Sequence, residues 1–263
     1  MGILHLVFRM GLIACCGLSA ACVRPGAPPP PREVPNLLTR HWVEERFSGV
    51  MVVPRADLGD WPARQLNPHN VKEDIDGGSA APISPDGYFL TADHVLARVA
   101  DGWHPFVLYG RGSQLKTARA RVVWRSAAAD LALLHAPIDT PNYYAWTAPG
   151  RWLSNGTWVI HGGIATGRRT PPGKLATHLA PEGPLTVARK FKLDFPLKPG
   201  DSGGPVVDAG GGLIGVNSAV EFLVPIDTAF FVDSEGSRPN VRQLMKRIER
   251  DRSRNTRPAG NVP

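Results

Sequence analysis

Short apolar or alternating runs, separated by Gly, Pro, Asn and Asp, dominate the middle of the chain. Runs of this length between turn residues predict β-strands rather than helices. We expect strands at 78–84, 88–92, 105–109, 118–124, 131–136, 157–162, 174–180, 185–193, 205–209, 213–219 and 228–233. Such a series of short strands favours an all-β barrel or sandwich.

A helical pattern stands out only near the C-terminus, in residues 241–250. The apolar positions there recur at the i, i+3, i+4, i+7 spacing of one helix face, and they are Val241, Leu244, Met245 and Ile248. We therefore predict a C-terminal helix packed on the β-structure, and we treat residues 241–263 as a basic helix and tail.

The charge of the chain, +7 overall, is concentrated near this end. Residues 242–257 carry seven basic and two acidic side chains, so the rest of the chain is close to neutral. A DNA-binding protein more often spreads basic charge over a folded face with aromatics among it. We expect no nucleic-acid partner and favour a solvated tail, with an anionic membrane surface as an alternative neighbour.

The first 21 residues have the features of a secretory signal peptide. Arg9 supplies positive charge, residues 10–18 are mostly apolar, and Ser-Ala-Ala precedes Cys22. This junction resembles the lipobox of bacterial lipoproteins, whose cysteine is lipidated, although Ser19 stands where that family prefers Leu. Leu-Ile-Ala-Cys at 12–15 is a second match, and simple cleavage into the periplasm is the alternative to lipidation.

The cysteines and prolines near the N-terminus set further bounds. All three cysteines lie within the first 22 residues, so the folded part has no cysteine nucleophile, internal disulfide or zinc–thiolate site. Residues 22–40 are rich in proline and read as an extended tether. We expect the folded domain to span residues 41–240, held near a membrane if Cys22 carries lipid.

A candidate nucleophile lies in Pro-Gly-Asp-Ser-Gly-Gly-Pro-Val-Val at 199–207. Alone, this stretch fits a plain glycine turn as well as an activated serine, because Ser202 would need a base and an orienting carboxylate. Among eight histidines, His94 has the most suggestive setting, at the end of an expected strand and the start of a short helical turn. Strand ends are rigid places to hold a base.

Two aspartates compete for the role of orienting carboxylate. Asp130 immediately precedes the apolar run Leu-Ala-Leu-Leu, where a buried carboxylate needs a cationic or hydrogen-bonding partner. Asp93 is adjacent to His94, but side chains of adjacent residues rarely point at each other in extended structure. We favour Asp130.

Three blocks in this order resemble the signatures of the trypsin-like serine peptidases: Thr-Ala-Asp-His-Val-Leu, Asp-Leu-Ala-Leu-Leu and Gly-Asp-Ser-Gly-Gly-Pro. The short spacing and the lack of cysteines are similar to the bacterial HtrA/Deg-like branch. The resemblance implies two six-stranded antiparallel β-barrels and a triad of His94, Asp130 and Ser202. It also implies an oxyanion hole formed by the backbone N–H groups of Gly200 and Ser202.

The resemblance also implies a substrate pocket. Its walls would include Leu197 before the serine, and Ser218, Ala219 and Val220 after it. No acid stands where a trypsin would have one, and Val220 replaces a glycine that keeps such pockets open. We therefore expect a small or aliphatic P1 residue rather than Arg or Lys.

Two features depart from the family pattern. No Ile-Val-Gly-Gly sequence lies near residue 45, so the amine that pairs with the aspartate before the nucleophile in zymogen-derived enzymes has no counterpart. Asp201 must find another partner, which the sequence does not reveal. No PDZ domain is expected after the peptidase domain.

The sequence therefore predicts a serine endopeptidase of the bacterial cell envelope, exported to the periplasm or anchored in a membrane, that acts on proteins or peptides. It implies no metal and no cofactor. A catalytically silent trypsin-like fold serving as a membrane-tethered binding module is the alternative. An esterase is a third possibility, although the α/β-hydrolase fold would place its serine in Gly-x-Ser-x-Gly on a strand–helix turn.

Overall fold

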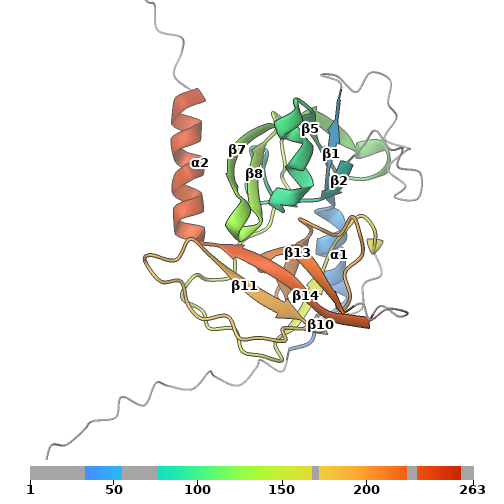
Figure 1. Cartoon of the computed structure of the whole chain (residues 1–263), viewed down its shortest axis with the longest axis vertical. Helices are drawn as coiled ribbons and strands as arrows, with labels where there is room; N and C mark the ends of the chain where they lie inside the picture. The colour runs from blue at the N-terminus through green and yellow to red at the C-terminus, as the bar shows by residue number, and fades with distance from the viewer. Residues whose placement is uncertain (1–32, 55–75, 168–171, 224–229, 256–263) are drawn as a thin grey trace, which may run out of the picture.

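Two β-barrels, one after the other along the chain, form the body of the computed structural model (Figure 1). The structure describes residues 33–54, 76–167, 172–223 and 230–255, without the side chains of residue 112 and of the strand positions 219–223 and 230–233. The expected signal peptide, Cys22, most of the tether and the end of the basic tail lie outside these residues. In the described part of the chain, no helix has the length and apolar character needed to cross a membrane.

The first barrel is built from two four-stranded sheets, in the orders β2-β1-β5-β6 and β3-β4-β8-β7. Their strands are β1 (Ser48–Val53), β2 (Asp76–Ser79), β3 (Ala81–Pro82), β4 (Tyr88–Thr91), β5 (His104–Tyr109), β6 (Lys116–Arg119), β7 (Arg121–Ser126) and β8 (Leu131–His135). Only Ala80 separates β2 from β3, and only Ala120 separates β6 from β7. Each of these pairs is one bent strand shared by both sheets, so the eight segments close a six-stranded barrel.

The second barrel is a six-stranded antiparallel sheet in the order β10-β9-β12-β13-β14-β11. Its strands are β9 (Trp158–His161), β10 (Gly173–Lys174), β11 (Ala188–Leu193), β12 (Pro205–Asp208), β13 (Leu213–Leu223) and β14 (Phe230–Pro239). An antiparallel bridge between Leu175 and Leu193 joins the two outer strands. The sheet therefore closes on itself and leaves no long free edge.

Burial on two sides explains why strand β8 of the first barrel has an almost unbroken apolar sequence. On β8, Ala132 and Leu134 face the interior of the first barrel, whereas Leu131 and Leu133 face a second cluster. That second cluster also contains β12 and β13 residues such as Val207. Because β8 is buried on both faces, it shows no polar alternation, and the shared cluster joins the two barrels.

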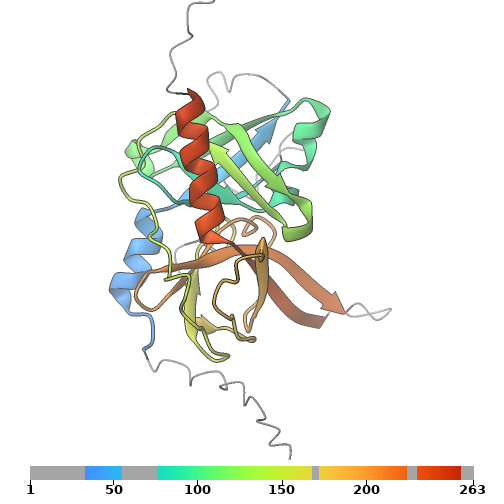
Figure 2. The same cartoon turned by 90° about the vertical axis from the view of Figure 1, so that its left-hand side faces the viewer.

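Helix α2 (Val241–Asn255) follows β14 directly and crosses from the second barrel to the first. Figure 2 shows it running along the outside of the first barrel. Leu244 and Ile248 enter the cluster between the barrels, as the apolar spacing predicts. Near its C-terminal end, Asp251 accepts a hydrogen bond of 2.7 Å from the Tyr88 hydroxyl and pairs with Arg121. The helix therefore fastens one barrel to the other.

The all-β fold class, the two barrels and the C-terminal helix agree with the sequence prediction. Two elements are additional: β1, and helix α1 (Leu37–Glu45), whose first turn is capped by the Asn36 side chain. Helix α1 spans the expected boundary between tether and domain at residue 40. The expected strand at 174–180 is also largely absent, since only β10 and single bridges at Leu175 and Leu179 form there.

Candidate active site

His94 is held where β4 gives way to the 3₁₀ helix η3 (Asp93–Asp101). The next two residues, Val95 and Leu96, are buried in the core of the first barrel. They fix the start of the helix, while the His94 side chain stays half exposed. The imidazole is thus partly exposed at the start of a well-packed helix.

Asp130 sits between a short 3₁₀ turn, η5 (Ala127–Ala129), and β8. Its backbone adopts φ = 50°, and it is the one non-glycine residue of the described chain with a positive φ. Aspartate tolerates this left-handed conformation better than most residues. The conformation turns its carboxylate toward His94 just before the chain enters the buried strand.

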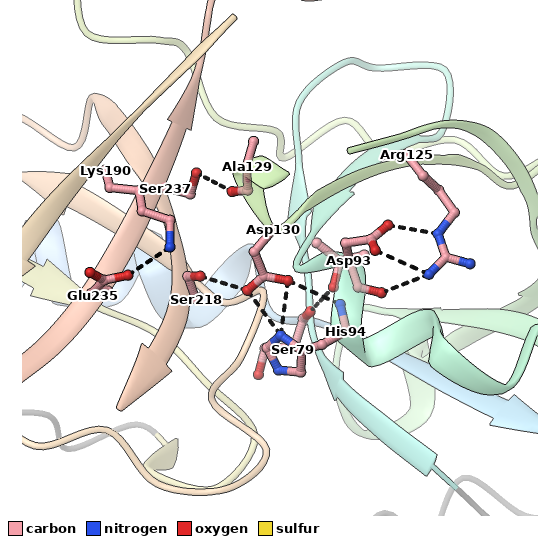
Figure 3. Close-up of polar contacts among 11 residues, drawn as sticks. Ser79, Asp93, His94, Arg125, Ala129, Asp130, Lys190, Ser218, Glu235 and Ser237 are labelled. Atoms are coloured by element: carbon pink, nitrogen blue, oxygen red, sulfur yellow. Dashed lines mark hydrogen bonds and ion pairs between the residues drawn. The ribbon is translucent and has the colours of Figure 1, made fainter. Parts of the chain in front are cut away.

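The two side chains face each other at hydrogen-bonding distance (Figure 3). His94 Nδ1 lies 3.0 Å from Asp130 Oδ1 and 2.9 Å from Oδ2, and the His94 backbone N–H donates to Oδ1 at 3.0 Å. With a carboxylate as its neighbour, Nδ1 carries the proton. This tautomer leaves Nε2 with a free lone pair, as a general base requires.

The pair also shifts both pKa values. The hydrogen bond that His94 donates to Asp130 is the largest influence on the imidazole and raises its pKa above the ordinary 6.5. Burial works to raise the pKa of Asp130, but hydrogen bonds from His94 and Ser218 outweigh it, so the pKa is lowered. Asp130 is therefore an anion at neutral pH and stabilises a protonated His94.

Ser218, on β13 of the second barrel, donates a hydrogen bond of 2.5 Å from its hydroxyl to Asp130 Oδ2. The residue is almost fully buried. From the sequence, Ser218 was expected in the substrate pocket, and this contact was not predicted. No local pattern of residues indicates it, because Ser218 and Asp130 lie on different barrels.

The rival aspartate points elsewhere. Asp93 Oδ1 accepts a hydrogen bond of 2.6 Å from Arg125 Nε, and Arg125 Nη2 lies 3.2 Å from Oδ2. Figure 3 shows the Asp93 carboxylate directed at Arg125, and Asp130 lying between Ser218 and His94. The carboxylate that contacts the imidazole is therefore that of Asp130, as predicted.

Ser202 lies in a tight turn that leads into β12. Asp201 N–H donates to the Lys198 carbonyl at 2.9 Å, and Gly204 N–H donates to the Asp201 carbonyl at the same distance. Gly200 has φ = 99°, a conformation that glycine adopts without strain. Gly203 has φ = 83°, and a Cβ there would lie 2.2 Å from both the Ser79 carbonyl oxygen and the Thr91 hydroxyl. Both positions therefore require glycine.

The donors expected for an oxyanion hole are the N–H groups of Gly200 and Ser202. Within the described part of the chain, neither N–H has a hydrogen-bond acceptor. The Ser202 hydroxyl likewise forms no hydrogen bond with a described residue, His94 included. The Ser202 carbonyl and the side chain of Val95, the residue after His94, both lie against Gly78. The turn thus meets the first barrel close to the segment that carries His94.

The structure identifies the partner of Asp201 that the sequence left open. The carboxylate is 0% exposed and accepts hydrogen bonds from the Thr166 N–H at 2.9 Å and the Lys198 N–H at 3.0 Å. The Thr166 hydroxyl is a third donor. Thr166 occupies a loop far from Asp201 in sequence and therefore escaped the sequence analysis.

The residues expected to line the substrate pocket lie close to the serine turn. Leu197 is buried in the core of the second barrel together with Phe191 and Phe195. Ala219 and Val220 continue β13 beyond Ser218, and their backbones pair with Glu235 and Ser234 of β14. Their side chains are not among those described, so the expected pocket wall stays a prediction.

His161 lies in the second barrel, and its surroundings are those of a core residue. His161 is buried on β9 and stacks on Phe195, with ring centroids 4.7 Å apart. Burial lowers the pKa of His161 to about 4, so its imidazole is neutral at neutral pH. Across the residues described, no group of three or more His, Cys, Asp or Glu side chains is arranged to hold a metal ion.

Residues 78–216 match the model of the trypsin-like peptidase domain, and this stretch is more than half of the chain and includes His94, Asp130 and Ser202. The chain belongs to this family. It is similar to a protein of Pseudomonas fluorescens named "Probable periplasmic serine endoprotease DegP-like", with 30% identity over 206 residues, 73% of this chain and 40% of the relative. A protein of the same name from Halomonas elongata is 28% identical over 214 residues, 76% of this chain and 41% of the relative.

The chain thus spans about 40% of the length of these curated relatives. Solved structures share the fold. The HtrA-type protease AlgW with a tripeptide has a TM-score of 0.55 at 20% identity, covering 80% of this chain and 62% of that one. Deg5 has a TM-score of 0.52 at 20% identity, covering 70% of this chain and 84% of that one.

Proposed function

We propose that the chain is a serine endopeptidase in which His94, Asp130 and Ser202 form the catalytic triad. The observation that carries this proposal is the contact of Asp130 with His94 Nδ1, at 2.9 Å, which leaves Nε2 available as a base. The family match and the names of the relatives support the same activity.

The reaction would follow the acyl-enzyme route. Ser202 Oγ attacks the carbonyl carbon of the scissile bond while its proton passes to His94 Nε2, and Asp130 stabilises the imidazolium that forms. The N–H groups of Gly200 and Ser202 would bind the oxyanion, each contributing about 3–4 kcal/mol to the transition state. His94 then gives the proton to the leaving amine, and water hydrolyses the ester by the reverse sequence.

Labelling with a fluorophosphonate tests the nucleophile directly. The purified chain should form one covalent adduct, Ser202→Ala should form none, and Ser253→Ala should label like the wild type. Ser253 is a suitable control because it is exposed on α2 and its hydroxyl bonds only to a carbonyl of its own helix. An unlabelled, well-folded wild-type chain would instead favour the silent binding module.

The type of substrate is a separate proposal. We expect cleavage of peptide bonds after small or aliphatic P1 residues, because no acidic residue of the sequence stands where the family pattern would bind a basic P1, and Val220 stands where that pattern has a glycine. A peptide library digested by the wild-type chain and by Ser202→Ala identifies the preference. Cleavage mainly after Arg or Lys contradicts it, and hydrolysis of esters without peptides points to an esterase.

The location is proposed from the N-terminal sequence and from relatives named periplasmic. We propose export and lipidation at Cys22, which would anchor the domain at a membrane through the proline-rich tether. Mass spectrometry of the mature N-terminus tests this: a lipid adduct on Cys22, absent from Cys22→Ser, is expected. A free amine at Val23 or beyond shows simple cleavage instead.

A further inference from the structure

Asp201, which is fully buried, stands between Gly200 and Ser202, the two residues whose N–H groups are the candidate oxyanion donors. Among the described residues its carboxylate accepts hydrogen bonds from Thr166 and Lys198 and forms no ion pair with a cationic side chain. His161 lies near enough to sense its charge, but burial keeps that imidazole neutral at neutral pH. A buried anion without a counter-ion is tolerated only if hydrogen bonds satisfy it.

Those hydrogen bonds come mainly from one loop, residues 163–167. Thr166 donates both its N–H and its hydroxyl to the Asp201 carboxylate. The loop closes as a single turn, with Gly167 N–H donating to the Gly163 carbonyl at 2.9 Å. At Gly163 a Cβ would lie 2.1 Å from Asp201 Oδ1, so a glycine is needed for the loop to wrap the carboxylate.

The same loop also reaches the serine turn through Ser79 at the end of β2. The Ser79 hydroxyl accepts a hydrogen bond of 2.8 Å from Ile164 N–H and donates one of 2.7 Å to the Gly200 carbonyl. Ser79 N–H donates to the Ser202 carbonyl at 2.8 Å. Ser79 is fully buried, so these bonds are protected from water and fix the carbonyls of the two residues whose N–H groups are the expected oxyanion donors.

We propose that Thr166, on loop 163–167, is a positioning residue that holds the Gly200 and Ser202 N–H groups in the geometry that binds an oxyanion, and that the bond from Ile164 to Ser79 is the second contact of this loop with the serine turn. Thr166 would thereby replace the new N-terminal amine that pairs with this aspartate in zymogen-derived enzymes. The oxyanion hole would then be formed in the chain without a cleavage near residue 45. This inference rests on the proposed peptidase function.

The test compares Thr166→Val with Thr166→Ser in the full chain. Valine keeps the shape and the backbone N–H but removes the hydroxyl donor, whereas serine keeps the donor. A hydrogen bond to a charged group is worth enough that its loss should lower kcat about ten- to hundredfold. KM should change less than threefold, because the ground-state contacts of the substrate are untouched, and Thr166→Ser should restore kcat to within a few fold.

Thr157→Val is the matched control. Thr157 is buried in the second barrel, whereas Thr166 is half-buried, and the Thr157 hydroxyl donates to the Ser154 carbonyl at 2.7 Å, away from the serine turn. Both valine variants should stay folded, and Thr157→Val should keep the wild-type kcat. The rate of fluorophosphonate labelling should fall with kcat in Thr166→Val only.

With an active wild-type chain, either of two results overturns the inference. One is a folded Thr166→Val with wild-type kcat, and the other is a Thr166→Ser as impaired as the valine variant. A folded wild-type chain that neither labels nor cleaves peptides overturns the proposed function and this inference with it. An active wild-type chain with an unaffected Thr166→Val overturns this inference alone.

Discussion

The two barrels hold their parts of the candidate site by different forces. In the first barrel, His94 is fixed by the apolar packing of Val95 and Leu96 next to it. In the second barrel, the turn around Ser202 is fixed by hydrogen bonds to the buried side chains of Asp201 and Ser79. Non-directional packing provides a stable mount, whereas hydrogen bonds to a glycine-containing turn determine where individual N–H groups point.

Because of this difference, we expect some variants to lower the stability of the fold and others to lower the rate of reaction. Loss of packing in the first barrel should lower the stability of the whole fold. Loss of a polar contact to Asp130 or to the serine turn should lower the rate of reaction with little effect on folding. The four predictions that follow test this division.

The largest effect on rate is expected from Asp130→Asn. It removes the carboxylate that orients His94, and kcat/KM should fall by about four orders of magnitude. The pH profile should also shift. In the wild type, activity rises as pH increases through the raised pKa of His94, above 6.5, because the neutral imidazole is the base. Removing the Asp130 contact lowers that pKa, so the residual activity should reach its plateau at lower pH.

Asp93→Asn is the control for this variant, because Asp93 bonds to Arg125 rather than to the imidazole. Its kcat/KM should stay within a few fold of the wild type. If Asp93→Asn were as inactive as Asp130→Asn, the orienting role would not belong to Asp130 alone.

The largest effect on stability is expected from Leu96→Ala. Leu96 belongs to η3 and is fully buried, and truncation of a buried leucine costs about 2–5 kcal/mol. Urea unfolding should show this loss, and Leu37→Ala, at a side chain 83% exposed on α1, should unfold like the wild type. Equal midpoints for the two variants would contradict the importance of packing at this position.

A moderate effect on rate is expected from Ser218→Ala. The variant removes the hydroxyl that donates to Asp130 across the barrel interface. The pKa of Asp130 should rise, since one of the hydrogen bonds that lower it is lost. We expect kcat/KM to fall about tenfold, in line with the loss of one hydrogen bond to a charged group. An unchanged kcat/KM would show that the His94 contact alone holds the carboxylate.

The smallest effect is expected where α2 fastens onto the first barrel. Asp251→Asn removes the carboxylate that pairs with Arg121 and accepts a hydrogen bond from Tyr88. The free energy of unfolding should fall by about 1 kcal/mol. The pKa of Asp251 is lowered by Arg121, so its contribution is present above the unfolded value near 3.8 and is lost as pH falls through the folded value.

The stability difference between Asp251→Asn and the wild type should therefore be visible by thermal unfolding at pH 7 and shrink below pH 4. Glu249→Gln, at an exposed position of the same helix, should show no difference at either pH. A difference that persists in strong acid would mean that the ion pair is not its source.

The strands and the positions of His94 and Asp130 could be predicted because each follows or precedes a buried run whose pattern is local. The burial of β8 on both faces, for example, is visible in the sequence as the apolar run Leu-Ala-Leu-Leu. Strand β1 was not predicted, although its six residues are all buried, because Ser-Gly-Val-Met-Val-Val alternates neither in polarity nor in size. Helix α1 was not predicted, because the proline-rich segment before it made Asn36 look like part of the expected tether rather than a helix cap.

The polar supports of the site could not be predicted for a different reason. Thr166 is 35 residues from Asp201, Ser79 is 121 residues from Gly200, and Ser218 is 88 residues from Asp130. Contacts at such separations depend on the closure of both barrels, and no local pattern of residue types encodes them. The sequence could show only that Asp201 needed a partner.

The central claim is that groups on the first barrel activate a serine on the second. Its most direct test is the rate of fluorophosphonate labelling, with the adduct located by peptide mass spectrometry, in the wild type, His94→Ala and Asp130→Asn. We predict a single adduct at Ser202 that forms at least a hundredfold more slowly in both variants. An adduct on another residue, or a labelling rate that is unchanged in His94→Ala, would contradict the claim.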